Sequence, residues 1–174
     1  RATCLGSAFH ELARLMVETG HAPCERRVSV VAASYGVSRR DRARLDAALA
    51  RWERSDIRSE ALSHACVRAE VPFFCRVDSP HGRYLEGAIY LLATDAGSDD
   101  ALLVDYKTGD HGLTLGQIRE RHEMQARFYA FVLRQQGWRH VTCAFVCVEL
   151  SDELGQPVVT RYEFGCPSST KLVA

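Results

Sequence analysis

Two polar residues stand at the end of an apolar segment in the middle of the chain. Residues 101–107 form this segment, and Asp105 and Lys107 lie two positions apart within it. In a strand, this spacing directs both side chains to the same face of the sheet. A carboxylate there can bind Mg²⁺, while a neighbouring ammonium group orients water and offsets charge on a phosphate. The pattern predicts a site for phosphodiester hydrolysis, with a simple salt bridge at the strand end as the alternative.

Four further residues of suitable chemistry lie elsewhere, and each also has an ordinary structural explanation. Gln125 and Tyr129 are four positions apart in an expected helix, so they share one face of it. They can position a phosphate or a water, or they can form the boundary of a buried stripe. His10 offers an imidazole as a metal ligand, or it is a structural histidine in a helix. Glu70 offers one more acid, or a carboxylate on the surface.

The spacing of apolar residues predicts the elements that position these side chains. Helical periodicity is found in the segments 6–19, 38–53, 56–65 and 117–136. Alternating or continuous β-branched and aromatic residues predict strands over 67–77, 84–93, 101–107, 141–150 and 158–164. Three strands joined by turns indicate an antiparallel meander, and the long helix before the fourth strand indicates a crossover connection. The expected fold class is α/β, with a mixed β-sheet flanked by helices.

The composition fits a single globular domain. A chain of 174 residues with 47% hydrophobic residues can bury one core. No apolar run approaches the ~20 residues that a membrane-spanning helix needs, so no membrane partner is expected. The formal net charge is zero, so any contact with nucleic acid must come from a local cluster. Arg39, Arg40 and Arg44 form such a cluster, which equally fits a solvated helix face.

The cysteines indicate the redox compartment that we expect for the protein, and the start of the chain indicates that we expect a fragment. Seven cysteines are scattered without a CxxC pair, which argues against a zinc ribbon or an iron–sulfur cluster. Buried thiols in a reducing cytosol are the expected explanation. The chain begins at Arg1 without an initiator Met or a signal peptide, so we expect a piece of a longer protein.

Five short motifs, in this order, resemble the RecB-like nuclease domain of bacterial helicase–nucleases such as AddA and RecB, in the PD-(D/E)XK superfamily. They are Gly6-x-x-x-His10, Ala69-Glu70-Val71-Pro72-Phe73, Leu85-Glu86-Gly87-Ala88-Ile89-Tyr90-Leu91-Leu92, Val104-Asp105-Tyr106-Lys107-Thr108-Gly109 and Gln125-x-x-x-Tyr129. The resemblance covers most of the chain and implies a restriction-endonuclease-like fold. It also implies Mg²⁺- or Mn²⁺-dependent exonuclease cleavage of DNA, in the repair and recombination of double-strand breaks.

The resemblance assigns a role to each motif residue. By it, His10 and Asp105 are metal ligands and Lys107 is the catalytic lysine. Gln125 and Tyr129 match the accessory motif of the RecB-like branch. Residues 1–174 would form one nuclease domain, a C-terminal fragment of a larger helicase–nuclease in the bacterial cytoplasm. Its partners would be DNA, the helicase domains of the same polypeptide and a partner helicase–nuclease subunit.

Tyr90 departs from the family pattern, which has an Asp at this position as the central metal ligand. A tyrosine with an ordinary pKa of ~10 is neutral at pH 7, and Mg²⁺ prefers carboxylate and water oxygens. Glu70 on a neighbouring strand is the only substitute in reach. We therefore expect weakened or absent metal binding and impaired catalysis in a module that binds DNA or acts as a scaffold. The alternatives are an active exonuclease with an altered metal site and an unrelated α/β binding domain.

Overall fold

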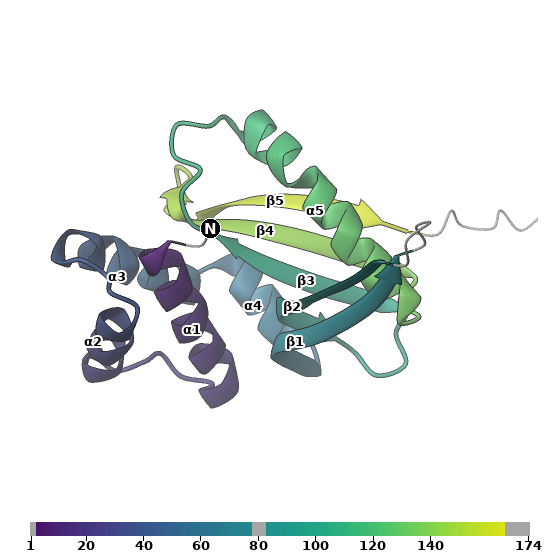
Figure 1. Ribbon diagram of the computed structural model, residues 1–174, viewed down its shortest axis with the longest axis horizontal. Helices are drawn as coiled ribbons and strands as arrows, with labels where there is room; N and C mark the ends of the chain where they lie inside the picture. The colour runs from purple at the N-terminus through teal and green to yellow at the C-terminus, as the bar shows by residue number, and fades with distance from the viewer. Residues whose placement is uncertain (1–2, 78–82, 166–174) are drawn as a thin grey trace, which may run out of the picture.

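The computed structural model describes residues 3–77 and 83–165 and follows the expected order of elements, with one additional helix (Figure 1). The helices are α1 (Cys4–Thr19), α2 (Glu25–Ser34), α3 (Arg39–Glu53), α4 (Asp56–Ser63) and α5 (Leu115–Gln135). The strands are β1 (Cys66–Val77), β2 (Arg83–Thr94), β3 (Asp100–Lys107), β4 (His140–Ser151) and β5 (Pro157–Phe164). Within the described ranges, no helix combines the length and the apolar character needed to cross a membrane.

The strands form one mixed sheet in the order β1-β2-β3-β4-β5. Neighbouring strands are antiparallel except for β3 and β4, which are parallel and are connected through α5. A parallel pair needs a crossover connection, and α5 provides it across one face of the sheet (Figure 1). The predicted fold class, with an antiparallel meander followed by a crossover helix, is therefore confirmed.

The sheet separates two apolar cores. On one face, α1 to α4 bury their apolar side chains against residues such as Val104 and Tyr106 of β3. On the other face, α5 packs against Leu103 of β3 and Phe145 of β4. Because successive residues of a strand point to opposite faces, Asp105 lies on the α5 side. A polar group at this position is therefore enclosed between a strand and a helix.

The helix α2 was not expected from the sequence. It buries only Val28, Val31 and Ala32, so its apolar stripe is short. Its N-cap residue, Cys24, makes no capping hydrogen bond through its side chain. The side-chain cap that usually marks a helix start is thus absent, and packing against the neighbouring helices supplies stability that the short stripe does not.

The strands β2 and β3 pair over a short stretch and then separate. Their register ends where Leu91 pairs with Val104, so Tyr90 and Asp105 are the first residues beyond the paired stretch. The strands β1 and β2 remain paired past this point and form a two-stranded ribbon (Figure 1). Glu70, which falls opposite Tyr90, has a φ of 49° and interrupts the β1–β2 ladder. The fork between β2 and β3 therefore gathers three of the residues singled out in the sequence.

Candidate functional site at the fork between β2 and β3

The carboxylate of Asp105 is the centre of a buried polar cluster between β3 and α5. Its Oδ1 lies 2.9 Å from the Nζ of Lys107, and its Oδ2 accepts a hydrogen bond from the Tyr129 hydroxyl at 2.9 Å. The side-chain amide of Gln125 donates to the same Oδ2 at 3.1 Å and accepts from Lys107 at 2.8 Å. The structure brings these four residues, here called the Asp105 cluster, together, whereas the sequence spacing had paired only Asp105 with Lys107 and Gln125 with Tyr129.

Local sequence explains how β3 and α5 present this cluster. The two β3 residues share a face because the strand repeats every two residues, and the two α5 residues share a face because they are four apart. The helix α5 begins with a capping box, in which the side chains of Thr114 and Gln117 each accept a hydrogen bond from the other's backbone N–H. This cap defines where α5 starts and therefore which of its residues face β3.

Burial dominates the electrostatics of the cluster. Asp105 has no exposed surface, and burial raises the pKa of its carboxyl group above the ordinary value, although the Lys107 ion pair acts in the opposite direction. Burial and the neighbouring Asp105 also raise the pKa of Tyr129, so its hydroxyl remains a hydrogen-bond donor. The Nζ of Lys107 lies 5.0 Å from the centre of the Phe145 ring, which adds a cation–π contact.

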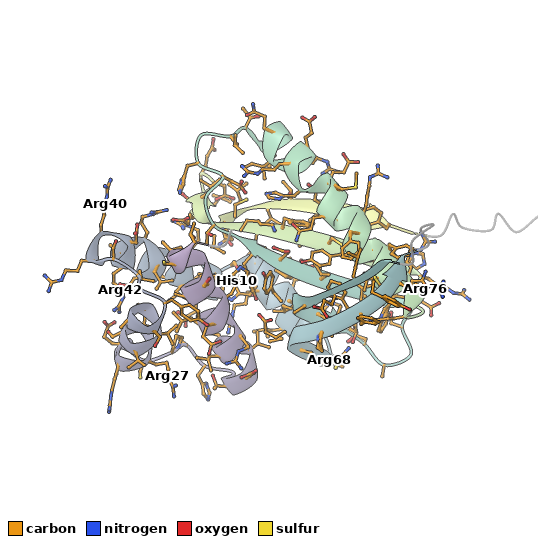
Figure 2. All side chains as sticks on the ribbon, viewed as in Figure 1. His10, Arg27, Arg40, Arg42, Arg68 and Arg76 are labelled. Carbon is orange, nitrogen blue, oxygen red and sulfur yellow. The ribbon has the colours of Figure 1, made fainter. Side chains whose placement is uncertain are left out.

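A pocket of about 280 Å³ opens between α1 and the end of β3. Its lining residues are Thr3, Gly6, Ser7, His10, Tyr90, Tyr106, Lys107 and Thr108. Gly6 lets α1 approach the strand, because a Cβ at this position would lie 2.8 Å from the Oγ1 of Thr108. The close approach brings His10, one turn further along α1, to the fork (Figure 2).

The rings of His10 and Tyr90 fill one side of this pocket. Their centroids are 3.8 Å apart, at an interplanar angle of 37°. Burial, together with the positive charge of Lys107, lowers the pKa of His10 to about 4, so the imidazole is neutral at pH 7. Burial and the nearby carboxylates of Asp105 and Glu70 raise the pKa of Tyr90, so the phenol is neutral as well. The buried Nδ1 of His10 has no hydrogen-bond partner among the described residues.

These residues do not fit a divalent metal ion. Mg²⁺ and Mn²⁺ bind through carboxylate, carbonyl and water oxygens, whereas the fork offers a neutral phenol in close contact with an imidazole. The Oδ2 of Asp105 accepts hydrogen bonds from Gln125 and Tyr129, whereas its buried Oδ1 is ion-paired with Lys107 and accepts no hydrogen bond from the described residues. No group of three His, Cys, Asp or Glu side chains that could hold a metal ion occurs in the described part of the chain, with or without Glu70.

The arginines predicted to contact DNA lie on α3, away from the fork. Arg39 and Arg40 are exposed in its first turn, and Arg40 extends outward from the molecule (Figure 2). Arg44 is instead engaged in ion pairs, at 2.7 Å to Asp41 and 2.7 Å to Glu149. Arg39 and Arg40 make no ion pair with the described residues, whereas Arg44 has a structural contact.

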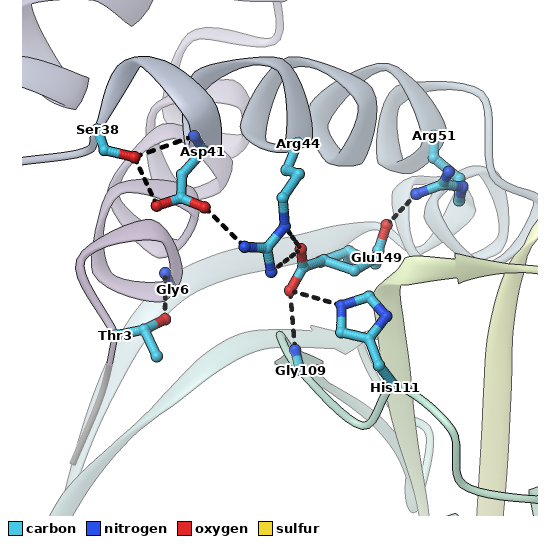
Figure 3. A network of polar contacts seen from close by, with 10 residues as sticks. Thr3, Gly6, Ser38, Asp41, Arg44, Arg51, Gly109, His111 and Glu149 are labelled. Carbon is cyan, nitrogen blue, oxygen red and sulfur yellow. Dashed lines mark hydrogen bonds and ion pairs between the residues drawn. The ribbon is translucent and has the colours of Figure 1, made fainter.

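Sequence reasoning did not single out Glu149, which joins α3 to the loop after β3 (Figure 3). Its side chain is only 4% exposed, and its Oε1 accepts from the Nε of Arg44 at 2.9 Å. Its Oε2 accepts from the backbone N–H of Gly109 at 2.8 Å and lies 3.6 Å from the Nε2 of His111. An acid near the end of an otherwise apolar strand was the available signal. Glu149 fixes the segment that directly follows Lys107.

A second pair missed from the sequence, Asp110 and His122, lies beside the Asp105 cluster. Asp110 has a φ of 43°, and its Oδ2 lies 2.9 Å from the Nε2 of His122. The His122 ring stacks on Phe145 at 5.3 Å, so Phe145 contacts both His122 and Lys107. His122 lies one turn before Gln125 on α5. This helical spacing was the signal in the sequence that could have placed His122 near the cluster. The pair links the loop after β3 to α5, beside the Asp105 cluster.

The match to a family model agrees with this fold. The model of the PD-(D/E)XK nuclease superfamily matches residues 1–162. Among solved structures, the chain is similar to SSO0001 with a TM-score of 0.41 and 12% identity, over 91% of this chain and 66% of that one. The chain thus spans slightly less than two thirds of that protein, and no curated protein matches it. Because the family model covers most of its length, the chain belongs to the PD-(D/E)XK nuclease superfamily.

Proposed function

We propose that this chain is the nuclease-fold domain of a helicase–nuclease in DNA break repair and recombination, and that it holds DNA without cutting it. The observation that carries the proposal is the close, tilted contact of the Tyr90 ring with His10, at the position where the family pattern has its central carboxylate. A neutral ring there supplies no charge to a hard cation. We infer that the domain has kept the nuclease architecture and lost its metal-dependent step.

The remaining polar residues support a retained framework. In the superfamily, cleavage of DNA generally depends on Mg²⁺ or Mn²⁺. Here Asp105 is buried and its oxygens face Lys107, Gln125 and Tyr129. This arrangement neutralises the carboxylate internally, so the cluster stabilises the contact between β3 and α5. In the proposed domain, His10, Lys107 and the two α5 residues are therefore positioning groups around the fork.

The helicase–nuclease context rests on the order of the motifs. Gln125 and Tyr129 both contact Asp105, which is consistent with a role as the accessory motif of the RecB-like branch. On this proposal, residues 1–174 are one domain of a longer bacterial cytoplasmic polypeptide. DNA, the helicase domains of that polypeptide and a partner subunit are its proposed partners, and Arg39 and Arg40 are proposed DNA contacts.

The intact Asp105 cluster also favours a second candidate function, an active exonuclease with an altered metal site. A domain without catalysis has no chemical use for the Lys107–Asp105 pair, yet the pair is present with short contacts to α5. This candidate requires a metal ion to bind without a second carboxylate at the fork. The two functions differ in one measurable property, which is cleavage of DNA by the unchanged chain.

A nuclease assay on linear single- and double-stranded DNA, with Mg²⁺ or Mn²⁺, tests the proposal. The unchanged chain and a Tyr90→Phe control are expected to leave both substrates intact. Tyr90→Asp restores a carboxylate and is expected to give metal-dependent cleavage, which adding Lys107→Ala removes. Cleavage by the unchanged chain that disappears in Lys107→Ala would instead establish the active exonuclease.

A further inference from the structure

The β1–β2 ribbon carries an exposed pair of stacked aromatic rings. Phe74 is 67% exposed and Tyr84 is 58% exposed. Their ring centroids are 5.0 Å apart and the ring planes differ by only 14°. Large apolar side chains that gather on a surface mark interaction sites more often than isolated ones do. The pair has no role in the core, so its exposure requires another explanation.

The opposite face of the ribbon is anchored to the body of the protein. Phe73 is buried over Gly87, where a Cβ would lie 2.6 Å from the ring. The Phe73 ring also contacts Phe128 and Tyr129 of α5, at centroid distances of 5.6 and 6.3 Å. This packing holds the ribbon against α5 and leaves the face of Phe74 and Tyr84 outward. The exposed stack is therefore presented on an anchored element.

The exposed stack and the fork pocket lie on the same face of β2. Alternation along the strand places Tyr84, Glu86, Ala88 and Tyr90 on one face. Tyr90 lines the pocket with His10, and Tyr84 lies six residues before it, or about 20 Å along the strand. A ligand that follows this face of the ribbon leads from the stacked rings to the pocket.

The chemistry around the stack fits a single-stranded nucleic acid. Flat aromatic rings stack on unpaired bases, which every base offers irrespective of sequence. Arg76 pairs with Tyr84 in the register, is exposed, and makes no ion pair with the described residues, so its charge is available to a phosphate. Paired bases in a duplex are stacked on one another and cannot reach these rings. Glu86, which pairs with Phe74, is an acid beside the rings and weakens the attraction.

We propose that Phe74, Tyr84 and Arg76 form a platform that binds single-stranded DNA and directs it along β2 toward the fork pocket. The proposal rests on the proposed function in taking DNA as the ligand. It adds the strand type and the residues that bind it. Stacking on Phe74 and Tyr84 supplies contact with the bases, and Arg76 supplies contact with the backbone.

Fluorescence anisotropy with a labelled mixed-sequence single strand, and with a duplex of equal length, tests the platform at low salt. Phe74→Leu and Tyr84→Leu keep an apolar side chain but remove the flat ring, and each is expected to weaken single-strand binding about 5- to 150-fold. Tyr84→Phe keeps the ring and should bind as the unchanged chain does. Tyr35→Leu, which alters an exposed tyrosine at the end of α2, is the matched control and should have no effect.

The charged residues give a second readout in the same assay. Arg76→Gln should reduce the slope of log affinity against log salt by about 0.7, as expected for one phosphate contact on a single strand. Glu86→Gln should tighten binding, because it removes the acid beside the rings. If these side chains had only a structural role, Arg76→Gln would not lower the salt slope and Glu86→Gln would not tighten binding.

The outcomes separate this proposal from the proposed function. Single-strand binding that survives both leucine variants overturns the platform and leaves the DNA-binding domain in place. Equal affinity for the duplex and the single strand also overturns it. Failure of the unchanged chain to bind either DNA overturns the platform together with the DNA-holding role, whereas the nuclease assay alone decides whether catalysis is lost.

Discussion

The imidazole of His10 lies against the phenol ring of Tyr90, with 3.8 Å between their centroids. Both rings are neutral at pH 7, because burial lowers the pKa of the first and raises that of the second. The resemblance to RecB-like nucleases implies that the same two positions face a metal ion in an active domain. Here they form an aromatic contact that fills the space between α1 and β2.

This contact makes the stability of the protein depend on pH. The folded His10 has a pKa of about 4, against 6.5 for the unfolded chain, so the unfolded state takes up the proton first as the pH falls. Stability is therefore complete above pH 6.5 and is lost between pH 6.5 and about 4. We expect His10 to account for a loss of about 2 kcal/mol of unfolding free energy between pH 7.5 and pH 5. Urea denaturation at the two pH values measures it.

The variant His10→Phe isolates this contribution. It keeps a ring against Tyr90 but cannot take up a proton, so the difference in stability between pH 7.5 and pH 5 should shrink by about 2 kcal/mol. His21→Phe changes an exposed histidine and should leave the difference as it is. An unchanged pH dependence in His10→Phe would show that the imidazole is not held neutral at the fork.

The Lys107–Asp105 pair is expected to behave as a unit. Lys107→Met leaves the fully buried Asp105 without its cation and should destabilise the protein by about 3 kcal/mol at pH 7. Adding Asp105→Asn removes the unpaired charge and should recover most of this loss. Urea denaturation of the two single variants and the double variant measures the coupling. Additive effects of the two substitutions would contradict an ion pair inside the protein.

The order of elements and two same-face pairs of the candidate site could be anticipated from the sequence, for physical reasons that are local. Strand period two aligns Asp105 with Lys107, and helical spacing aligns Gln125 with Tyr129. The apolar stripes of α1, α3 and α5 were visible in the same way. Only α2 was missed, because its stripe is short and its N-cap makes no side-chain hydrogen bond.

The features that could not be anticipated depend on register between distant segments. The sequence does not show that the pairing of β2 with β3 stops at the Leu91–Val104 pair. This end of the pairing leaves Tyr90 free of β3 and in contact with His10. The contact of Arg44 with Glu149 joins positions 105 residues apart. The sequence alone therefore predicts for Arg44 a contact with DNA or a place on a solvated helix face, because its partner Glu149 lies on a strand whose place in the sheet has first to be known.

Glu149 is expected to anchor the loop that follows Lys107. Glu149→Ala removes the acceptor of the Gly109 N–H and of Arg44, and should cost about 1–3 kcal/mol of unfolding free energy. It should also increase amide hydrogen exchange in residues 108–113, because that segment loses its link to β4. Glu123→Ala breaks an exposed pair with Arg127 on α5 and should cost less than about 1 kcal/mol. Equal costs for the two variants would contradict the anchoring role.

Gly87 and Gly116 should respond to alanine with opposite signs. A Cβ at Gly87 would lie 2.6 Å from the Phe73 ring, which cannot retreat because Phe128 and Tyr129 pack behind it. Gly87→Ala should therefore destabilise the protein by about 1–3 kcal/mol through overpacking. Gly116 lies at the start of α5, where a Cβ would meet only the Oγ1 of Thr114 at an ordinary contact distance of 4.0 Å, so Gly116→Ala should stabilise by up to about 1 kcal/mol through helix propensity. Thermal denaturation measures both, and a neutral Gly87→Ala would mean that Phe73 does not anchor the ribbon to α5.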